Sequence, residues 1–367
     1  MKRLLSLLVL FSACEDRLQE PPLLNAPGAI TVLEESTTPT GDTGWWPSVR
    51  FDAHDTPHIA YCDAALGNVR YATRKEGVWQ LETVAEEGSV GKYLTLGIDQ
   101  NNQPAIAYYD QGRQKITVAF RTQKNTWRFE DVAIGREIGI GSVLYFLPNN
   151  DAYLFYYTAK GRLMLALRKE ASEDSHWQVS TLHEAYGGYS AEISAAYHEG
   201  YLFITFIHWG FKSTELLWAK GQDKDWQITS LPLEPGAGWR STLAFASGQK
   251  RLVYTVGSKK ELRWAVEKNG RWHQQRLLVN VGNMAATATS SGNFVIAYED
   301  VAPRQKVLST LKLLKQVGNT WQRYAIDSDG PVGDHMSIAL NAAGKPLVVY
   351  RAYPIKGLRL YDETELP

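Results

Sequence analysis

The sequence is poor in cysteine, in long apolar runs and in excess charge. Its only cysteines are Cys14 and Cys62, too few for the disulfide framework that stabilises many small secreted domains. The apolar stretch at residues 4–11 is much shorter than the roughly 20 residues that a membrane-spanning helix needs. Lysine plus arginine and aspartate plus glutamate each total 39, so no net field draws the protein to nucleic acid or to an anionic membrane surface. We therefore expect neither a nucleic-acid partner nor a transmembrane helix.

Motifs that would indicate a metal, a cofactor or a catalytic nucleophile are also lacking. His198 and His208 have no neighbouring ligands at the spacing of a zinc site. Residues 327–330 resemble the start of a calcium loop, but the later carboxylate of that loop is missing. The sequence contains no Gly-x-Ser-x-Gly elbow and no glycine-rich phosphate loop. We expect no metal and no cofactor.

The N-terminus has the pattern of an export signal, with two basic residues before an apolar stretch and small residues before Cys14. Residues 11–14, Phe-Ser-Ala-Cys, resemble a bacterial lipobox. That resemblance implies a diacylglycerol on Cys14 and an exported protein held by lipid alone at the bacterial outer membrane or cell surface. Residues 1–13 are then a signal peptide, and the proline-containing residues 14–28 a tether. The alternative is an ordinary secretory signal followed by an incidental cysteine.

A repeat of about 48 residues runs through the rest of the chain. One register of tryptophans opens short alternating segments at intervals of 46 to 50 residues: Trp79, Trp127, Trp177, Trp226, Trp272 and Trp321. A second register of aromatic residues ends apolar runs: Tyr61, Tyr108, Tyr156, Phe206, Tyr254, Tyr298 and Tyr350. With the segments between these registers, each unit has four short strands separated by turn residues, which is the pattern of a propeller blade. The sequence predicts an all-β fold, a seven-bladed β-propeller of four-stranded antiparallel blades over residues 29–367.

The two registers differ in number, and the difference predicts how the ring closes. The last unit has only three strand segments before Pro367, whereas residues 29–33 stand one period before Trp79. Pairing the two ends of the chain in one sheet would remove an open edge. We expect residues 29–33 to be the outermost strand of the last blade. The repeated tryptophans are interpreted first as packing between neighbouring blades.

One face of the predicted disc carries the loops that enter each first strand, and these loops share the pattern Gly-x-large. The four tryptophans outside the repeat, Trp45, Trp46, Trp209 and Trp239, all fall in loops of this face. They predict either a plug of the central channel or a concave aromatic platform with a few polar groups, the usual anatomy of a ligand site. The candidate binding residues on this face are Trp46, Tyr93, Tyr189, Trp209, Trp239, His335, Asp110 and Arg351.

The repeat unit also has a recognisable local signature. It contains an Asp-x-x-x-x-Pro turn, as at residues 52–57, an Ile-Ala-Tyr-x-Asp run, as at residues 106–110, and a tryptophan-led fourth strand. This unit resembles that of bacterial secreted propellers of the sialidase-like and lectin-like superfamily. The resemblance implies a fold shared by carbohydrate-binding lectins and glycoside hydrolases, so it indicates fold better than activity. The Ser-x-Asp-x-Gly-x-Thr-Trp box of sialidases is absent from the sequence.

Three functions remain open. The first is a non-catalytic, monomeric envelope lipoprotein that binds a glycan or an envelope protein through the aromatic face. The second is a glycoside hydrolase or lyase, for which Asp63, Asp110, Glu299 and Asp300 are the carboxylates on the same face. The third is a structural scaffold of an envelope complex. We expect the first, with no catalytic residue.

Overall fold

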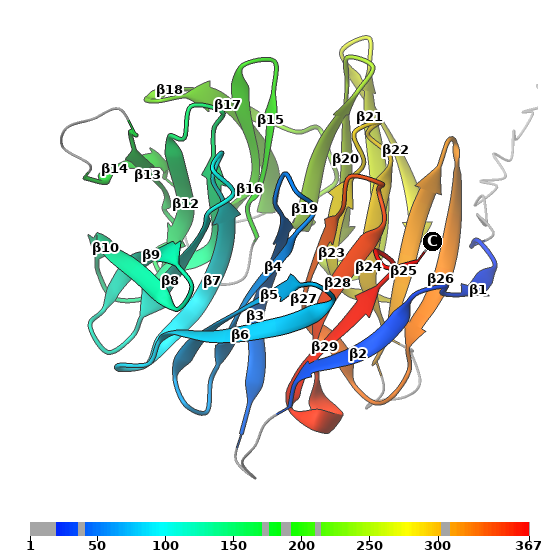
Figure 1. Cartoon of the computed structure of the whole chain (residues 1–367). Coiled ribbons are helices and arrows are strands. Elements are labelled where there is room, and N and C mark those ends of the chain that lie inside the picture. Colours follow the sequence, from blue (N-terminus) through cyan, green and yellow to red (C-terminus); the bar gives the residue numbers. More distant parts are fainter. Residues whose placement is uncertain are drawn as a thin grey trace, which may run out of the picture.

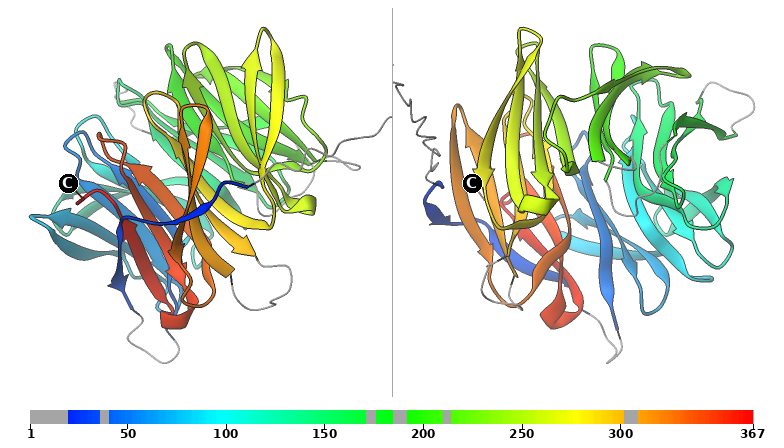
Figure 2. Two further views of the ribbon diagram at one scale, coloured as in Figure 1. Left: turned by 90° about the vertical axis from the view of Figure 1, so that its right-hand side faces the viewer. Right: turned by 180° about the vertical axis from the view of Figure 1, so that it is seen from behind.

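The computed structural model describes residues 20–35, 41–170, 176–184, 192–209, 214–301 and 309–366. In this part of the chain the protein is an all-β ring of seven blades (Figures 1 and 2), and no helix is long and apolar enough to cross a membrane. Each blade has four antiparallel strands, with the first strand nearest the axis of the ring. The predicted seven-bladed propeller is confirmed.

The strands follow one another blade by blade along the chain. Blade 1 contains β3 (Thr43–Phe51), β4 (Pro57–Asp63), β5 (Asn68–Lys75) and β6 (Val78–Ala85), and blade 2 contains β7 (Val90–Ile98), β8 (Pro104–Asp110), β9 (Lys115–Gln123) and β10 (Thr126–Ile134). Blade 3 contains β11 (Ile138–Phe146), β12 (Ala152–Thr158), β13 (Leu163–Arg168) and β14 (Gln178–His183), and blade 4 contains β15 (Ser194–His198), β16 (Tyr201–Trp209), β17 (Thr214–Gln222) and β18 (Asp225–Ser230). Blade 5 contains β19 (Ala237–Ala246), β20 (Gln249–Val256), β21 (Glu261–Lys268) and β22 (Arg271–Leu278), and blade 6 contains β23 (Val281–Ala288), β24 (Phe294–Val301), β25 (Ser309–Val317) and β26 (Thr320–Asp327). Blade 7 contains β27 (Val332–Leu340), β28 (Pro346–Ala352), β29 (Gly357–Asp362) and the N-terminal β2 (Ala29–Glu34).

Strand β2 closes the ring, as the sequence predicts. It pairs antiparallel with β29, with Ala29 opposite Asp362, and Figure 1 shows β2 in blue alongside β29 in red. Glu34, at the end of β2, then forms an ion pair with Arg70 of blade 1 at 3.1 Å and accepts a hydrogen bond from the Tyr61 hydroxyl. The closing strand therefore links blade 7 to blade 1 as well as completing blade 7.

A further strand, β1 (Leu23–Asn25), lies within the segment that the sequence analysis assigned to a tether. It pairs in parallel with β26, the outermost strand of blade 6, with Leu23 opposite Arg323. Glu20 also forms an ion pair with Arg323. An unpaired outer strand is a template for pairing with another strand. Here β1 of the same chain pairs with the outer edge of β26. The segment is polar and proline-rich, so its pairing had no signal in the strand pattern.

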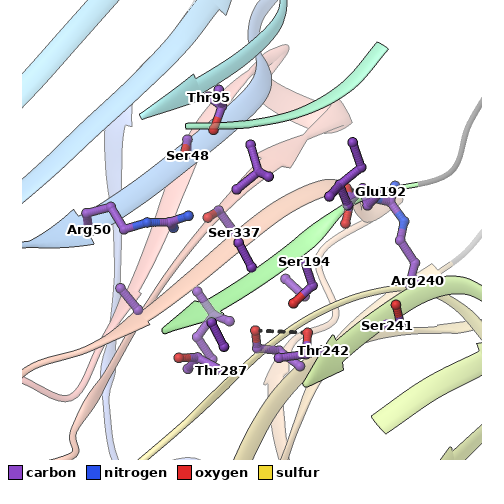
Figure 3. A pocket seen from close by; sticks show the side chains of 18 of the residues that line it. Ser48, Arg50, Thr95, Glu192, Ser194, Arg240, Ser241, Thr242, Thr287 and Ser337 are labelled. Carbon is purple, nitrogen blue, oxygen red and sulfur yellow. Dashed lines mark hydrogen bonds and ion pairs between the residues drawn. The ribbon is translucent and has the colours of Figure 1, made fainter. Parts of the chain in front are cut away.

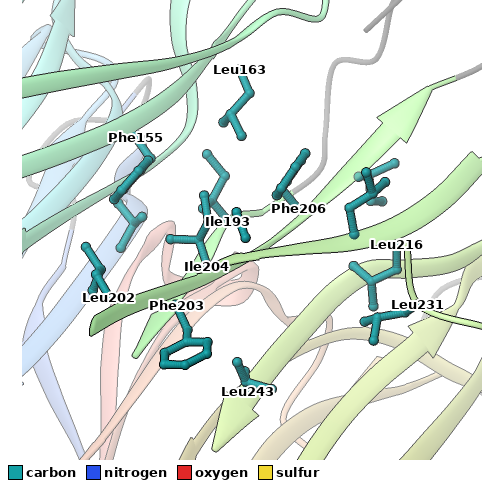
Figure 4. Close-up of a cluster of buried hydrophobic side chains, with 14 of the residues drawn as sticks. Phe155, Leu163, Ile193, Leu202, Phe203, Ile204, Phe206, Leu216, Leu231 and Leu243 are labelled. Atoms are coloured by element: carbon teal, nitrogen blue, oxygen red, sulfur yellow. The ribbon is translucent and has the colours of Figure 1, made fainter. Parts of the chain in front are cut away.

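The repeated tryptophans and tyrosines occupy the positions that the repeat predicts. The aromatic residues of the second register lie in the second strands and are at most 5 % exposed. All six tryptophans of the first register pack against the hydrophobic clusters that fill the space in and between blades. Figure 4 shows one such cluster, where Phe155 of blade 3, Phe206 of blade 4 and Leu243 of blade 5 contribute to one core.

Some of these tryptophans also carry polar links between neighbouring blades. The indole nitrogen of Trp127 in blade 2 donates to Glu82 of blade 1 at 3.3 Å, and Arg121 pairs with the same carboxylate at 2.6 Å. One blade further on, Trp177 donates to Glu130 at 3.0 Å. Because Glu82 is buried, its charge needs both partners. The repeat therefore encodes a recurrent contact between blades as well as apolar packing.

Candidate functional site

A cavity of about 870 Å³ lies on the axis of the ring. The first strands of all seven blades line it, and Figure 3 shows the polar side chains that project into it. Trp46, Tyr93 and His335 line the cavity where the first strands begin, at its mouth on the predicted ligand face. Of the candidate binding residues that the structure describes, these three are the ones that the fold brings together around the cavity.

The mouth is shaped by a bulge that recurs at the start of the first strands. In blade 2, Gly91 has a φ of 99°, and a Cβ atom at this position would lie 2.9 Å from Sγ of Cys62 in blade 1. The glycine of the Gly-x-large pattern is therefore required by the backbone and by the close approach of the neighbouring blade. Two residues later the chain is left-handed again, with φ of 48° at Trp46 in blade 1 and 56° at Tyr93 in blade 2. Bulky side chains rarely adopt this conformation.

The aromatic side chains at the mouth contact one another across blades 7, 1 and 2. The ring of Trp46 lies 5.7 Å from that of Tyr93 and 5.7 Å from that of His335, between centroids. Trp45 does not line the cavity but contacts this group, with its ring centroid 4.7 Å from that of His335. We call Trp46, Tyr93 and His335 the mouth cluster. These distances and tilted arrangements are those of favourable aromatic contacts.

His335 is a neutral member of this cluster at physiological pH. Burial lowers the pKa of its imidazole to about 4, and the nearby guanidinium groups of Arg240 and Arg351 act in the same direction. The carboxylates of Asp334 and Asp42 oppose this shift. A neutral imidazole can donate one hydrogen bond and accept another. It suits the recognition of an uncharged hydroxyl group.

Arg351 does not line the cavity; it contacts Trp45, which lies beside the mouth cluster. Its side chain is 3 % exposed, and it forms an ion pair with Asp42 and lies 3.5 Å from Asp334. The Cζ atom of its guanidinium lies 4.3 Å from the ring centroid of Trp45 and 3.9 Å from that of Tyr353. A buried cation held this way fixes the orientation of the aromatic ring beside it. The ion pairs and the two aromatic rings therefore hold Arg351 beside Trp45.

The other candidate residues lie elsewhere. Trp209 and Trp239 contact each other at 5.3 Å between ring centroids, in blades 4 and 5, and neither lines the cavity. Asp110 is buried and accepts hydrogen bonds from the backbone and guanidinium of Arg113, which fixes its own loop. Tyr189 lies outside the described residues. Cys14 does so as well.

Carboxylates are scarce around the cavity. Among the described residues that line it, Glu192 is the one carboxylate, and it forms an ion pair with Arg240. Of the four acids considered for hydrolysis, Asp300 pairs with Lys312, and Glu299 accepts a hydrogen bond from the backbone of Asn283. Glycoside hydrolysis normally needs two carboxylates across the scissile bond. No group of three or more metal-ligating side chains occurs within the described ranges.

The middle of the cavity contains features that the sequence reasoning missed. Ser337 of blade 7 accepts a hydrogen bond from the backbone of Val49 in blade 1 at 3.2 Å, and Ser48 accepts one from Leu96 in blade 2 at 3.1 Å. Thr95 accepts the equivalent hydrogen bond from the backbone N–H of Leu144 in blade 3 at 3.4 Å. We call Ser48, Thr95 and Ser337 the hydroxyl belt. The sequence pattern that could have predicted this belt is a serine or threonine four residues after the glycine of the Gly-x-large pattern.

Comparison with known proteins supports the fold. No known protein family matches the sequence, and no curated protein does so. Among solved structures, a triple arginine-to-alanine mutant of AofleA from Arthrobotrys oligospora is similar with a TM-score of 0.53 and 12 % identity, over 82 % of this chain and 89 % of that one. A mutant of Aleuria aurantia lectin in complex with Fucα1-6GlcNAc is similar with a TM-score of 0.51 and 12 % identity, over 81 % of this chain and 98 % of that one. At these identities the likeness establishes a shared propeller architecture.

Proposed function

We propose that this protein is a non-catalytic glycan-binding propeller, and that its ligand binds at the mouth cluster. The observation that carries the proposal is the left-handed backbone of Trp46 and Tyr93. The equivalent residue of blade 3 is Gly141, which has a φ of 62° without steric cost. A bulky residue in that conformation costs about 1–3 kcal/mol. Blades 1 and 2 carry that cost with large aromatic side chains, both of which line the cavity.

The chemistry of the mouth suits a sugar. The C–H faces of a pyranose ring can lie against indole and phenol rings, while its hydroxyl groups find the neutral imidazole of His335 and the ion pair of Arg240 with Glu192. Each aromatic contact is worth about 0.5–1.5 kcal/mol beyond the buried area, so the three rings together supply a useful part of a micromolar affinity. Lectin neighbours of the same fold, one crystallised with Fucα1-6GlcNAc, make fucose-containing glycans the first ligands to test.

Binding is favoured over hydrolysis because of the charges at the cavity. Glu192 stands without a second carboxylate among the described lining residues, and the other candidate acids are occupied by contacts within their own blades. A hydrolase or lyase acting here would lack its acid and base pair. A purely structural scaffold would leave the cost of the strained aromatic residues unexplained.

The experiment is a glycan array probed with the folded protein, followed by a turnover assay on labelled oligosaccharides and a pull-down from membranes. Retention of a glycan class with no cleavage supports the proposal. Cleavage that is lost in Asp110→Asn or Glu299→Gln variants would support the hydrolase instead. A blank array with recovered protein partners would support the scaffold.

We also propose that the protein is a monomer held at the bacterial cell envelope by a lipid on Cys14. The support is the sequence pattern of residues 1–14. Fractionation and fatty-acid labelling of the wild type and of Cys14→Ser test it. Loss of label and release of the variant from membranes are expected, whereas unlabelled wild-type protein in the soluble fraction would contradict it.

A further inference from the structure

Arg50 is a cation within the axial cavity that has no acidic partner in the part of the chain that the structure describes. It lies on β3, four residues after Trp46, and its side chain extends into the cavity (Figure 3). Its Nη1 atom donates to the carbonyl oxygen of Val49 at 2.8 Å, and among the described residues it forms no ion pair with a carboxylate. Burial lowers the pKa of this guanidinium, and the electrostatic interaction with the Tyr145 side chain opposes that shift. Most of its five N–H donors are therefore available.

The hydroxyl belt offers further donors at the same place. Ser48, Thr95 and Ser337 each accept a backbone N–H from the next blade, as described above. A hydroxyl group whose oxygen accepts a hydrogen bond still has its own proton to donate. None of these three protons has an acceptor among the described residues, and all three side chains line the cavity. The middle of the cavity thus presents donors without matching acceptors.

We propose that the axial cavity binds an oxyanion, a carboxylate, sulfate or phosphate group, on Arg50 and the hydroxyl belt. An arginine fork and hydroxyl donors are the groups that recognise such anions, and the bonds are strong because one partner is charged. A partly buried cation without an acidic partner is unfavourable, and a bound anion offsets that cost. Apart from its histidines, the described lining carries the charged residues Arg50, Arg240 and Glu192, whose charges sum to one net positive charge.

This site is distinct from the proposed glycan site. Four residues of extended strand separate Trp46 from Arg50, a distance of about 13 Å, and the belt lies between them. The anion is either a free inorganic ion or the acidic group of a ligand that reaches into the cavity from the mouth. Inorganic probes test the site itself, so its failure and that of the glycan proposal give different results.

The experiment is isothermal titration of the full chain with phosphate, sulfate and acetate, with Arg50→Gln and Arg50→Lys as variants and Arg162→Gln as the matched control. Arg162 is exposed and outside the cavity. We expect binding of at least one oxyanion by the wild type and the control, at least tenfold weaker binding by Arg50→Gln, and an intermediate affinity for Arg50→Lys. Equal affinity of Arg50→Gln and wild type, or no heat of binding with any of the three anions, would overturn the proposal.

A second measurement covers the case in which Arg50→Gln does not fold. The double variant Ser48→Ala and Ser337→Ala keeps the guanidinium and removes two belt donors, and it should bind the same anion at least threefold more weakly than wild type; unchanged affinity would count against the site. Thermal shifts in sulfate are compared as differences from Arg162→Gln, because sulfate stabilises folded proteins in general. A uronic-acid oligosaccharide and its neutral analogue then distinguish the source: an Arg50-dependent preference for the acidic sugar indicates a glycan acid, and no preference indicates a free ion.

Discussion

Acidification should destabilise this propeller through His335, and the size of the effect follows from its surroundings. The imidazole has a pKa of about 4 in the folded protein, against 6.5 for its unperturbed value. Between these values the unfolded chain binds a proton that the folded protein does not, so the free energy of unfolding falls as pH is lowered through this window. A shift of this size corresponds to about 3 kcal/mol, at about 1.4 kcal/mol for each pKa unit. The contribution of His335 to the free energy of unfolding is fully present above pH 6.5 and is lost toward pH 4.

The test compares urea unfolding of the wild type and of His335→Gln, followed by tryptophan fluorescence between pH 7 and pH 4. Glutamine keeps a polar side chain of similar length and does not titrate, so the variant should lose up to about 3 kcal/mol less than wild type over this range. Some slope will remain in both, because burial also lowers the pKa of His58 and of His183. Parallel stability profiles of the two proteins would refute the assignment of His335 as a partly buried group that is neutral in the folded protein.

Three further predictions concern the ring itself and are read from urea or thermal unfolding. Deleting residues 29–34 uncovers the edge of blade 7 and should abolish the single cooperative unfolding transition. Deleting residues 23–25, the fifth strand of blade 6, should lower the melting temperature by only a few degrees. An unchanged transition after the first deletion would contradict the proposed closure of the ring by β2. Glu82→Ala leaves the partly buried Arg121 and the indole N–H of Trp127 without their shared partner and should cost about 1.5–3 kcal/mol; a cost below about 1 kcal/mol would show that the contact between blades is dispensable. Gly91→Ala meets both positive φ and a neighbouring side chain and should cost about 2–4 kcal/mol, against about 1 kcal/mol for Gly77→Ala, whose Cβ meets open space; equal costs would contradict the close approach of the blades.

The architecture was predictable because it repeats. A tryptophan such as Trp127 and a tyrosine such as Tyr61 recur with one spacing. The tryptophan register has one member fewer than the aromatic register of the second strands, so the last blade needs a strand from the other end of the chain. Periodicity reports which side chains face a common core, and that information is local. Strand β1 has no such periodicity, because its Leu23 and Leu24 are exposed and only the outer edge of β26 selects it.

The candidate site was predictable only in part. The Gly-x-large pattern located Trp46, Tyr93 and His335, because loops that enter first strands must gather around the axis. The same reasoning did not separate these from Trp239, which turns toward Trp209. That choice depends on which neighbouring blade offers a pocket. Arg50 was missed because a single charged residue in an alternating strand reads as an ordinary solvated position.

The most direct test of the glycan-binding account is a titration of the best array ligand into wild type, Trp46→Gly and Trp239→Ala. Glycine is the residue that blade 3 uses at the position of Trp46, so the first variant keeps the bulge and removes only the ring. We predict at least tenfold weaker binding by Trp46→Gly, a loss of about 1.4 kcal/mol or more, with binding within twofold of wild type for Trp239→Ala, which lies outside the cavity lining. Wild-type affinity in Trp46→Gly would contradict the account.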